Sequence, residues 1–204
     1  NHQNETLMLL NSVVLILQEI LEAALLISIL LVLSRQLELS SRWILAGMIL
    51  GGLGAFILSV NLAAISEWFD YAGQEILIAG IMLAVLGLLT WIGLYSKLPP
   101  SPSRHALPYL MSICVALALS REGAEIVIYL GGILNHQESI QPTFIGAGIG
   151  AGIGLSAGVL LYFGLLSLPV GWIFCTCIVL LALIGGTMAC QATLLLTQVD
   201  WIAY

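Results

Sequence analysis

Long apolar runs alternate with short polar breaks along the whole chain. Six of the runs hold at least about 20 residues, which is the length that a helix needs to cross the hydrocarbon core of a bilayer. We expect these helices at residues 6–33, 43–66, 73–96, 106–134, 142–167 and 170–197. The pattern predicts an all-α, polytopic membrane protein with six transmembrane helices.

The breaks alternate in charge. The first carries Arg35 and Arg42, and the third carries Lys97 and Arg104, whereas the second and fourth carry acidic residues and no Lys or Arg. Loops rich in Lys and Arg stay in the cytoplasm. We therefore expect a multi-pass protein of the cell (plasma or inner) membrane with both termini extracytoplasmic.

The two halves of the chain share a pattern. Glu19 and Glu22 recur 103 positions later as Glu122 and Glu125, and a glycine pair in the next helix recurs 100 positions later. Three helices per half give the halves opposite polarity in the membrane, as in the inverted repeats of secondary transporters. We expect one membrane permease domain over residues 1–204, with repeat one at about 6–96 and repeat two at about 106–197.

Glycines at four-residue spacing mark the fifth predicted helix, at Gly146, Gly150, Gly154 and Gly158. Small residues at this spacing let helix backbones approach closely inside a membrane. We read the stripe as a packing surface, which could help to bring the carboxylates of the first and fourth helices together.

Composition narrows the function. The chain has 204 residues, of which 60% are hydrophobic and 8% charged, with a net charge of −6; this balance argues against nucleic acid as a partner. The three histidines lie outside the helix centres, so we expect no haem, and we expect no nucleotide cofactor. Neither a His-Glu-x-x-His nor a Gly-x-Ser-x-Gly motif is present, and we expect no enzyme.

The four cysteines fall in apolar runs, where Cys acts as a small hydrophobe.

Four carboxylates lie at helix centres, and they are the candidate metal ligands. Glu19 and Glu22 share one helix face, as do Glu122 and Glu125. A charge at that depth costs at least about 2.5 kcal/mol and needs a partner. Carboxylates without imidazole or thiolate favour a hard cation, which leaves iron, manganese, calcium and magnesium open. Arg121 would tune the charge of the site.

A structural ion-pair network between two helices is the alternative interpretation of these residues. Their recurrence at equivalent positions of a repeat favours a transport site. Near the extracytoplasmic end, Glu67, Asp70 and Glu75 are candidate entry ligands that could attract cations. We favour the simpler interpretation, an ordinary polar loop with Glu75 as a solvated charge at a helix end.

The sequence Arg121-Glu122-Gly123-Ala124-Glu125 resembles a motif of the oxidase-dependent iron permease family, which includes fungal and bacterial members. That family carries Arg-Glu-Gly-x-Glu in its first and fourth helices. In the first copy here, Gln18 replaces the arginine and Ile20 replaces the glycine. The resemblance implies import of iron ions, with an extracytoplasmic oxidase or iron-delivery protein as a partner.

Two alternatives remain at this stage. The chain could transport another hard divalent metal, which the changes at Gln18 and Ile20 leave open. It could also be a membrane anchor subunit for an extracytoplasmic redox partner. Uptake of metal into proteoliposomes separates a transporter from an anchor.

Overall fold

The structure, a computed structural model, describes residues 2–67, 72–95, 106–134 and 140–198, and its regular structure there is helical with no strand. The helices begin and end within four residues of the predicted limits. They are α1 (His2–Gln36), α2 (Arg42–Ser66), α3 (Gly73–Tyr95), α4 (Leu107–Leu134), α5 (Ile140–Leu166) and α6 (Val170–Gln198).

Five of these helices are long and apolar enough to cross a membrane: α1, α2, α3, α5 and α6. α4 falls outside that group, and it carries Arg121, Glu122 and Glu125 in its middle. Its 28 residues nevertheless give a length of about 42 Å, more than the hydrocarbon core of about 30 Å.

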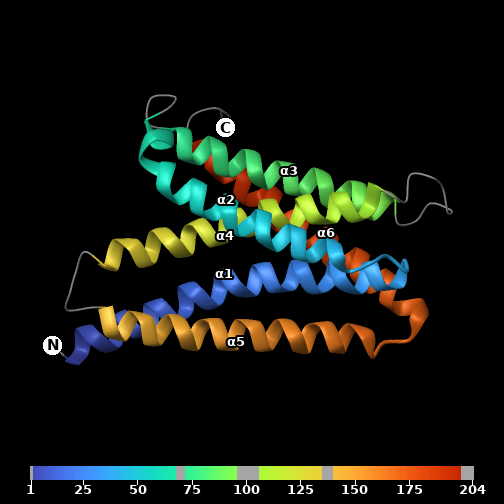
Figure 1. Cartoon of the computed structure of the whole chain (residues 1–204), viewed down its shortest axis with the longest axis horizontal. Helices are drawn as coiled ribbons and strands as arrows, with labels where there is room; N and C mark the ends of the chain where they lie inside the picture. Colours follow the sequence, from blue (N-terminus) through green and yellow to red (C-terminus); the bar gives the residue numbers. More distant parts are fainter. Residues whose placement is uncertain (1, 68–71, 96–105, 135–139, 199–204) are drawn as a thin grey trace.

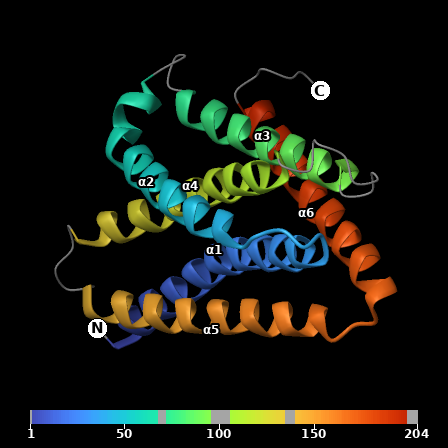
Figure 2. The same cartoon turned by 45° about the vertical axis from the view of Figure 1, so that its right-hand side comes forward.

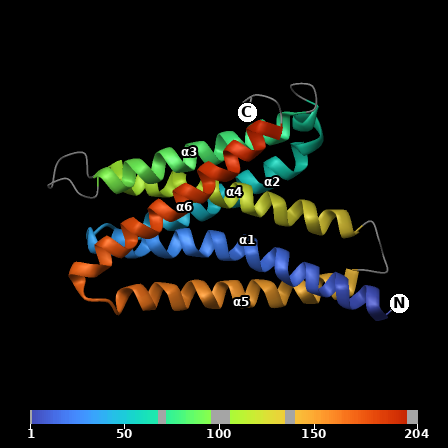
Figure 3. The same ribbon diagram turned by 180° about the vertical axis from the view of Figure 1, so that it is seen from behind.

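Successive helices run in opposite directions. α1, α3 and α5 point one way and α2, α4 and α6 point the other way (Figure 1). The most extensive packing joins α1 to α5 and α2 to α4, followed by α3 to α6. α5 lies along one edge of the bundle beside α1 (Figure 2), and α6 crosses the bundle diagonally from the end of α5 to α3 (Figure 3).

Glycines make the two largest helix contacts possible. A Cβ added at Gly150 in α5 would lie 2.6 Å from the carbonyl oxygen of Val13 in α1. A Cβ added at Gly51 in α2 would lie 2.6 Å from the Cβ of Leu119 in α4. The glycine stripes therefore act as packing surfaces, and each lies against a helix that carries a glutamate pair.

Most of the large, fully buried side chains lie on one side of the glutamate pairs. In α1 they include Leu30 and Leu33, which follow the glutamates, and in α4 they include Met111 and Val115, which precede them. Because α1 and α4 run in opposite directions, these residues meet on the same side, toward the α1–α2 turn. A hydrogen bond from Trp43 Nε1 to Ser34 Oγ of 2.9 Å ties that turn together.

The outside of the bundle is apolar. Large hydrophobic side chains of every helix are exposed, including Phe56 at 64% and Leu160 at 72%. An exposed apolar surface of this extent is unusual for a protein in water and suits contact with lipid. The protein is a multi-pass membrane protein.

Candidate metal centre

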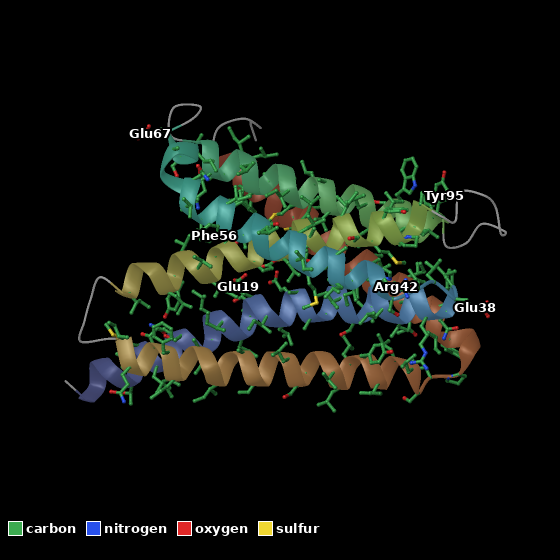
Figure 4. The ribbon with its side chains drawn as sticks, in the orientation of Figure 1. Glu19, Glu38, Arg42, Phe56, Glu67 and Tyr95 are labelled. Carbon is green, nitrogen blue, oxygen red and sulfur yellow. The ribbon has the colours of Figure 1, made fainter. Side chains whose placement is uncertain are left out.

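α1 and α4 bring three carboxylates together. One carboxylate oxygen from each of Glu19, Glu122 and Glu125 lies within 4.8 Å of the other two. Glu19 projects from α1 into the space between α1 and α4 (Figure 4). Oxygens at this separation can reach a single cation placed between them.

Two of these carboxylates are buried and incompletely satisfied. Glu122 is 2% exposed and Glu19 is 7% exposed. The Oε2 atom of each is buried with no hydrogen-bond partner among the described residues. A buried polar oxygen without a partner is costly. Two such oxygens lie close together here, one on α1 and one on α4.

Arg121 forms ion pairs with three carboxylates. Its Nη1 donates a 2.8 Å hydrogen bond to Oε1 of Glu122 and lies 3.6 Å from Oε2 of Glu22. Its Nε lies 3.3 Å from Oε1 of Glu125, without hydrogen-bonding geometry. One positive charge thus faces carboxylates from both α1 and α4.

Glu22 occupies a different place from the other three predicted ligands. Its side chain is 37% exposed, and its only recorded ion pair within the described chain is with Arg121. Residues three apart on a helix share a face but differ by about 60° in direction, as 3.6 residues per turn requires. Glu19 therefore points into the cluster while Glu22 lies at its edge.

The glycine position of the motif is filled differently in the two helices. In α4, a Cβ added at Gly123 would lie 2.8 Å from the Cβ of Ala55 in α2. In α1, Ile20 stands at this position, and it faces Gly154 of α5, where a Cβ would lie 2.9 Å from Ile20 Cγ2. In this contact the small residue is Gly154 of α5, and its lack of a side chain leaves room for Ile20.

The candidate entry ligands lie away from the cluster or outside the described residues. Glu67 is exposed at the end of α2, far from Glu19 (Figure 4). Glu75 lies in the first turn of α3, and its Oε2 is buried without a hydrogen-bond partner among the described residues. Asp70 lies outside the described residues.

A cavity missed by the sequence analysis adjoins the site. It has a volume of about 280 Å³ and lies among α3, α4 and α6, with Arg121, Glu125 and Gln191 in its wall. A smaller cavity of about 40 Å³ also reaches Arg121 and Glu125, and Gln74 lines it. Gln191 lies within an apolar run and Gln74 lies at the edge of one. A carboxamide in such a position is the feature of the sequence that could have pointed to both residues.

The helices and the buried carboxylates define the class: a polytopic α-helical membrane protein with an acidic site inside its bundle. The family model of the Iron permease FTR1 family matches residues 102–201. This match covers α4, α5 and α6, and it confirms the resemblance inferred from Arg121-Glu122-Gly123-Ala124-Glu125. The family is one of transporters, and it implies iron as the transported substrate. Searches of curated proteins and of solved structures gave no match.

Proposed function

We propose that this protein imports iron across the membrane and that the ion passes through a site formed by Glu19, Glu122 and Glu125, with Glu22 at its edge. Arg121 tunes the site because its positive charge neutralises part of the negative charge of the carboxylates. An extracytoplasmic oxidase or delivery protein supplies the iron. The observation that carries the proposal is the pair of buried, unpartnered oxygens on Glu19 and Glu122, within reach of Glu125.

The chemistry of the cluster supports a cation as its ligand. Carboxylate oxygens bind hard and borderline metal ions, and a cation would satisfy both unpartnered atoms at once. A structural ion-pair network accounts for Glu22, Glu122 and Glu125, because Arg121 pairs with all three across α1 and α4. It leaves out Glu19, whose Oε2 is buried without a hydrogen-bond partner among the described residues.

The helix packing supports an inverted repeat of three helices plus three, with α4 as the sixth span. Exchanging α1 with α4, α2 with α5 and α3 with α6 converts the α1–α5 contact into the α4–α2 contact, and the α3–α6 contact into itself. These are the three most extensive contacts in the bundle. A site between the first helices of the repeats is the arrangement found in many secondary transporters.

Iron uptake into proteoliposomes tests the proposal. The parent protein should accumulate iron, and Glu122→Gln and Glu19→Gln should each lower the initial rate at low iron by at least about tenfold. Loss of an outer-sphere partner alone costs about 10–100-fold in metal affinity, and these residues would be direct ligands.

Glu38→Gln is the matched control, because Glu38 is an exposed glutamate in the α1–α2 turn. It should transport at the parental rate. Uptake near the parental rate by Glu122→Gln, or no uptake by the parent, would refute the proposed function.

A further inference from the structure

The cavity among α3, α4 and α6 extends from Arg121 and Glu125 to Leu195, three residues before the end of α6. Both cavities that reach Arg121 and Glu125 also share Ile78 in their walls, so they lie against the same part of α3. Gln74, in the wall of the smaller cavity, is the second residue of α3. α3 begins at the end of the bundle where α4 and α6 finish, so Gln74 lies near that end (Figure 1).

The side-chain carboxamides of Gln74 and Gln191 lie in the walls of these cavities. Gln191 is half-buried in α6, about 10 Å from the helix end at a rise of 1.5 Å per residue. No hydrogen bond of its side chain is recorded within the described chain. A carboxamide without a partner inside a membrane is costly. A water-filled cavity removes this cost, and the carboxamide oxygen is a ligand that hard cations accept.

Between α1 and α4, described side chains obstruct both directions of approach to the cluster. At the same end of the bundle, a 2.7 Å hydrogen bond between Ser12 Oγ and Tyr129 Oη joins α1 to α4. At the opposite end, fully buried apolar side chains fill the space between α1 and α4, among them Leu33 and Met111. The two cavities lead to Glu125, past Gln191 in the larger one and past Gln74 in the smaller one.

We propose that cations reach Glu125 through the two cavities that share Ile78, Arg121 and Glu125 in their walls, with the carboxamide oxygens of Gln191 in the larger cavity and Gln74 in the smaller one as transient ligands on the way. This inference rests on the proposed function and adds to it the route and two residues that select for an oxygen-binding cation. Glu125, 36% exposed at its side chain, is the first carboxylate of the cluster that the ion meets.

Thiol labelling tests the route without measuring transport. In Gln191→Cys, a charged, membrane-impermeant methanethiosulfonate reagent should modify the new cysteine when added on the side where α6 ends. The natural Cys190 is the matched control: it is exposed on the adjacent position of the same helix but absent from the cavity wall. Facing lipid, it should stay unmodified. Mass spectrometry assigns the modified residue.

Ferrous iron added before the reagent should slow the labelling of Gln191→Cys at least several-fold. Equal labelling of Cys190 and of the new cysteine, or labelling only from the side of the α1–α2 turn, would overturn the route. Should Gln191→Cys fold poorly, Leu195→Cys provides a second reporter in the same wall.

Uptake kinetics test the role of the carboxamide. Gln191→Leu should raise the KM for iron by about tenfold, by analogy with the loss of an outer ligand, and Gln191→Glu, which keeps an oxygen, should restore it. An unchanged KM in Gln191→Leu would overturn the ligand role. If Glu122→Gln abolishes uptake while Gln191→Cys stays unlabelled, the route fails and the proposed function stands; if Glu122→Gln transports normally, the function itself fails.

Discussion

At the residue scale, the balance of charge around Arg121 sets the properties of the site. The Arg121 guanidinium pairs with Glu22, Glu122 and Glu125, and the carboxyl group of Glu19 lies beside two of these partners. The guanidinium is planar and offers several N–H donors, so it can contact more than one carboxylate at once. The excess of negative charge that remains is what a cation would neutralise.

Removing Arg121 should destabilise the protein. Deleting one partner of a buried ion pair costs about 3–5 kcal/mol in soluble proteins, and Arg121 is 10% exposed at its side chain. We expect Arg121→Leu to lower the midpoint of thermal unfolding in detergent, and Arg121→Leu/Glu122→Gln to recover part of the loss. Arg42→Leu, at an exposed position, is the control. Equal midpoints for Arg121→Leu and the parent would mean that the ion pairs contribute little.

The sequence predicted which carboxylates come together better than it predicted the directions of their side chains. The repeated spacing of two glutamates, and their position near the centres of apolar helices, predicted that Glu19, Glu122 and Glu125 lie close together, as they do. Spacing alone treated Glu22 as equivalent to Glu19, whereas the direction of its side chain depends on how α1 is rotated against α4. Gln191 was missed because its position beside the site depends on how α6 crosses the bundle.

At the scale of helices, the location of the small residues decides which helices pair. The limits of all six helices followed from runs of apolar residues and polar breaks. The pairing of α1 with α5 and of α2 with α4 did not follow, because a glycine stripe indicates close packing without naming its partner. Gly154 opposite Ile20 shows the consequence: a substitution that looks unfavourable in the motif is accommodated by a residue 134 positions away.

Enlarging Gly154 should separate α1 from α5. A Cβ there would lie 2.9 Å from Ile20, whereas a Cβ at Gly152 would meet nothing within 4 Å. We expect Gly154→Leu to lower the free energy of unfolding by about 1–3 kcal/mol, as overpacking does, and Gly152→Leu to leave it nearly unchanged. Thermal unfolding of the two variants, each purified in the same detergent, measures the difference. Equal midpoints would count against close α1–α5 packing at this site.

At the scale of the whole molecule, the two sides of the cluster differ. The cavity lies on the side where α3 begins and α6 finishes, and most of the large buried apolar side chains lie on the other side. A transporter must expose its site to the two sides of the membrane in turn. Under the proposed function, this arrangement would be the state in which the site is reached from the side of the cavity.

The charge of the loops predicts which compartment the side of the cavity faces. Arg35 and Arg42 flank the α1–α2 turn on the opposite side, which favours the cytoplasm. We expect a periplasmic or extracellular reporter fused after Tyr204 to be active and a cytoplasmic reporter to be inactive. A reporter inserted after Glu38 should give the opposite result. Activity of the cytoplasmic reporter after Tyr204 would reverse the orientation.

The position of a bound ion tests the central claim most directly. A structure of the purified protein with iron, determined by X-ray diffraction at and below the iron absorption edge, locates the metal by its anomalous scattering. The account predicts a peak between α1 and α4 within bonding distance of carboxylate oxygens of Glu19, Glu122 and Glu125, and no peak there in Glu122→Gln. A fully occupied iron site elsewhere in the bundle, with these three carboxylates unoccupied, would contradict it.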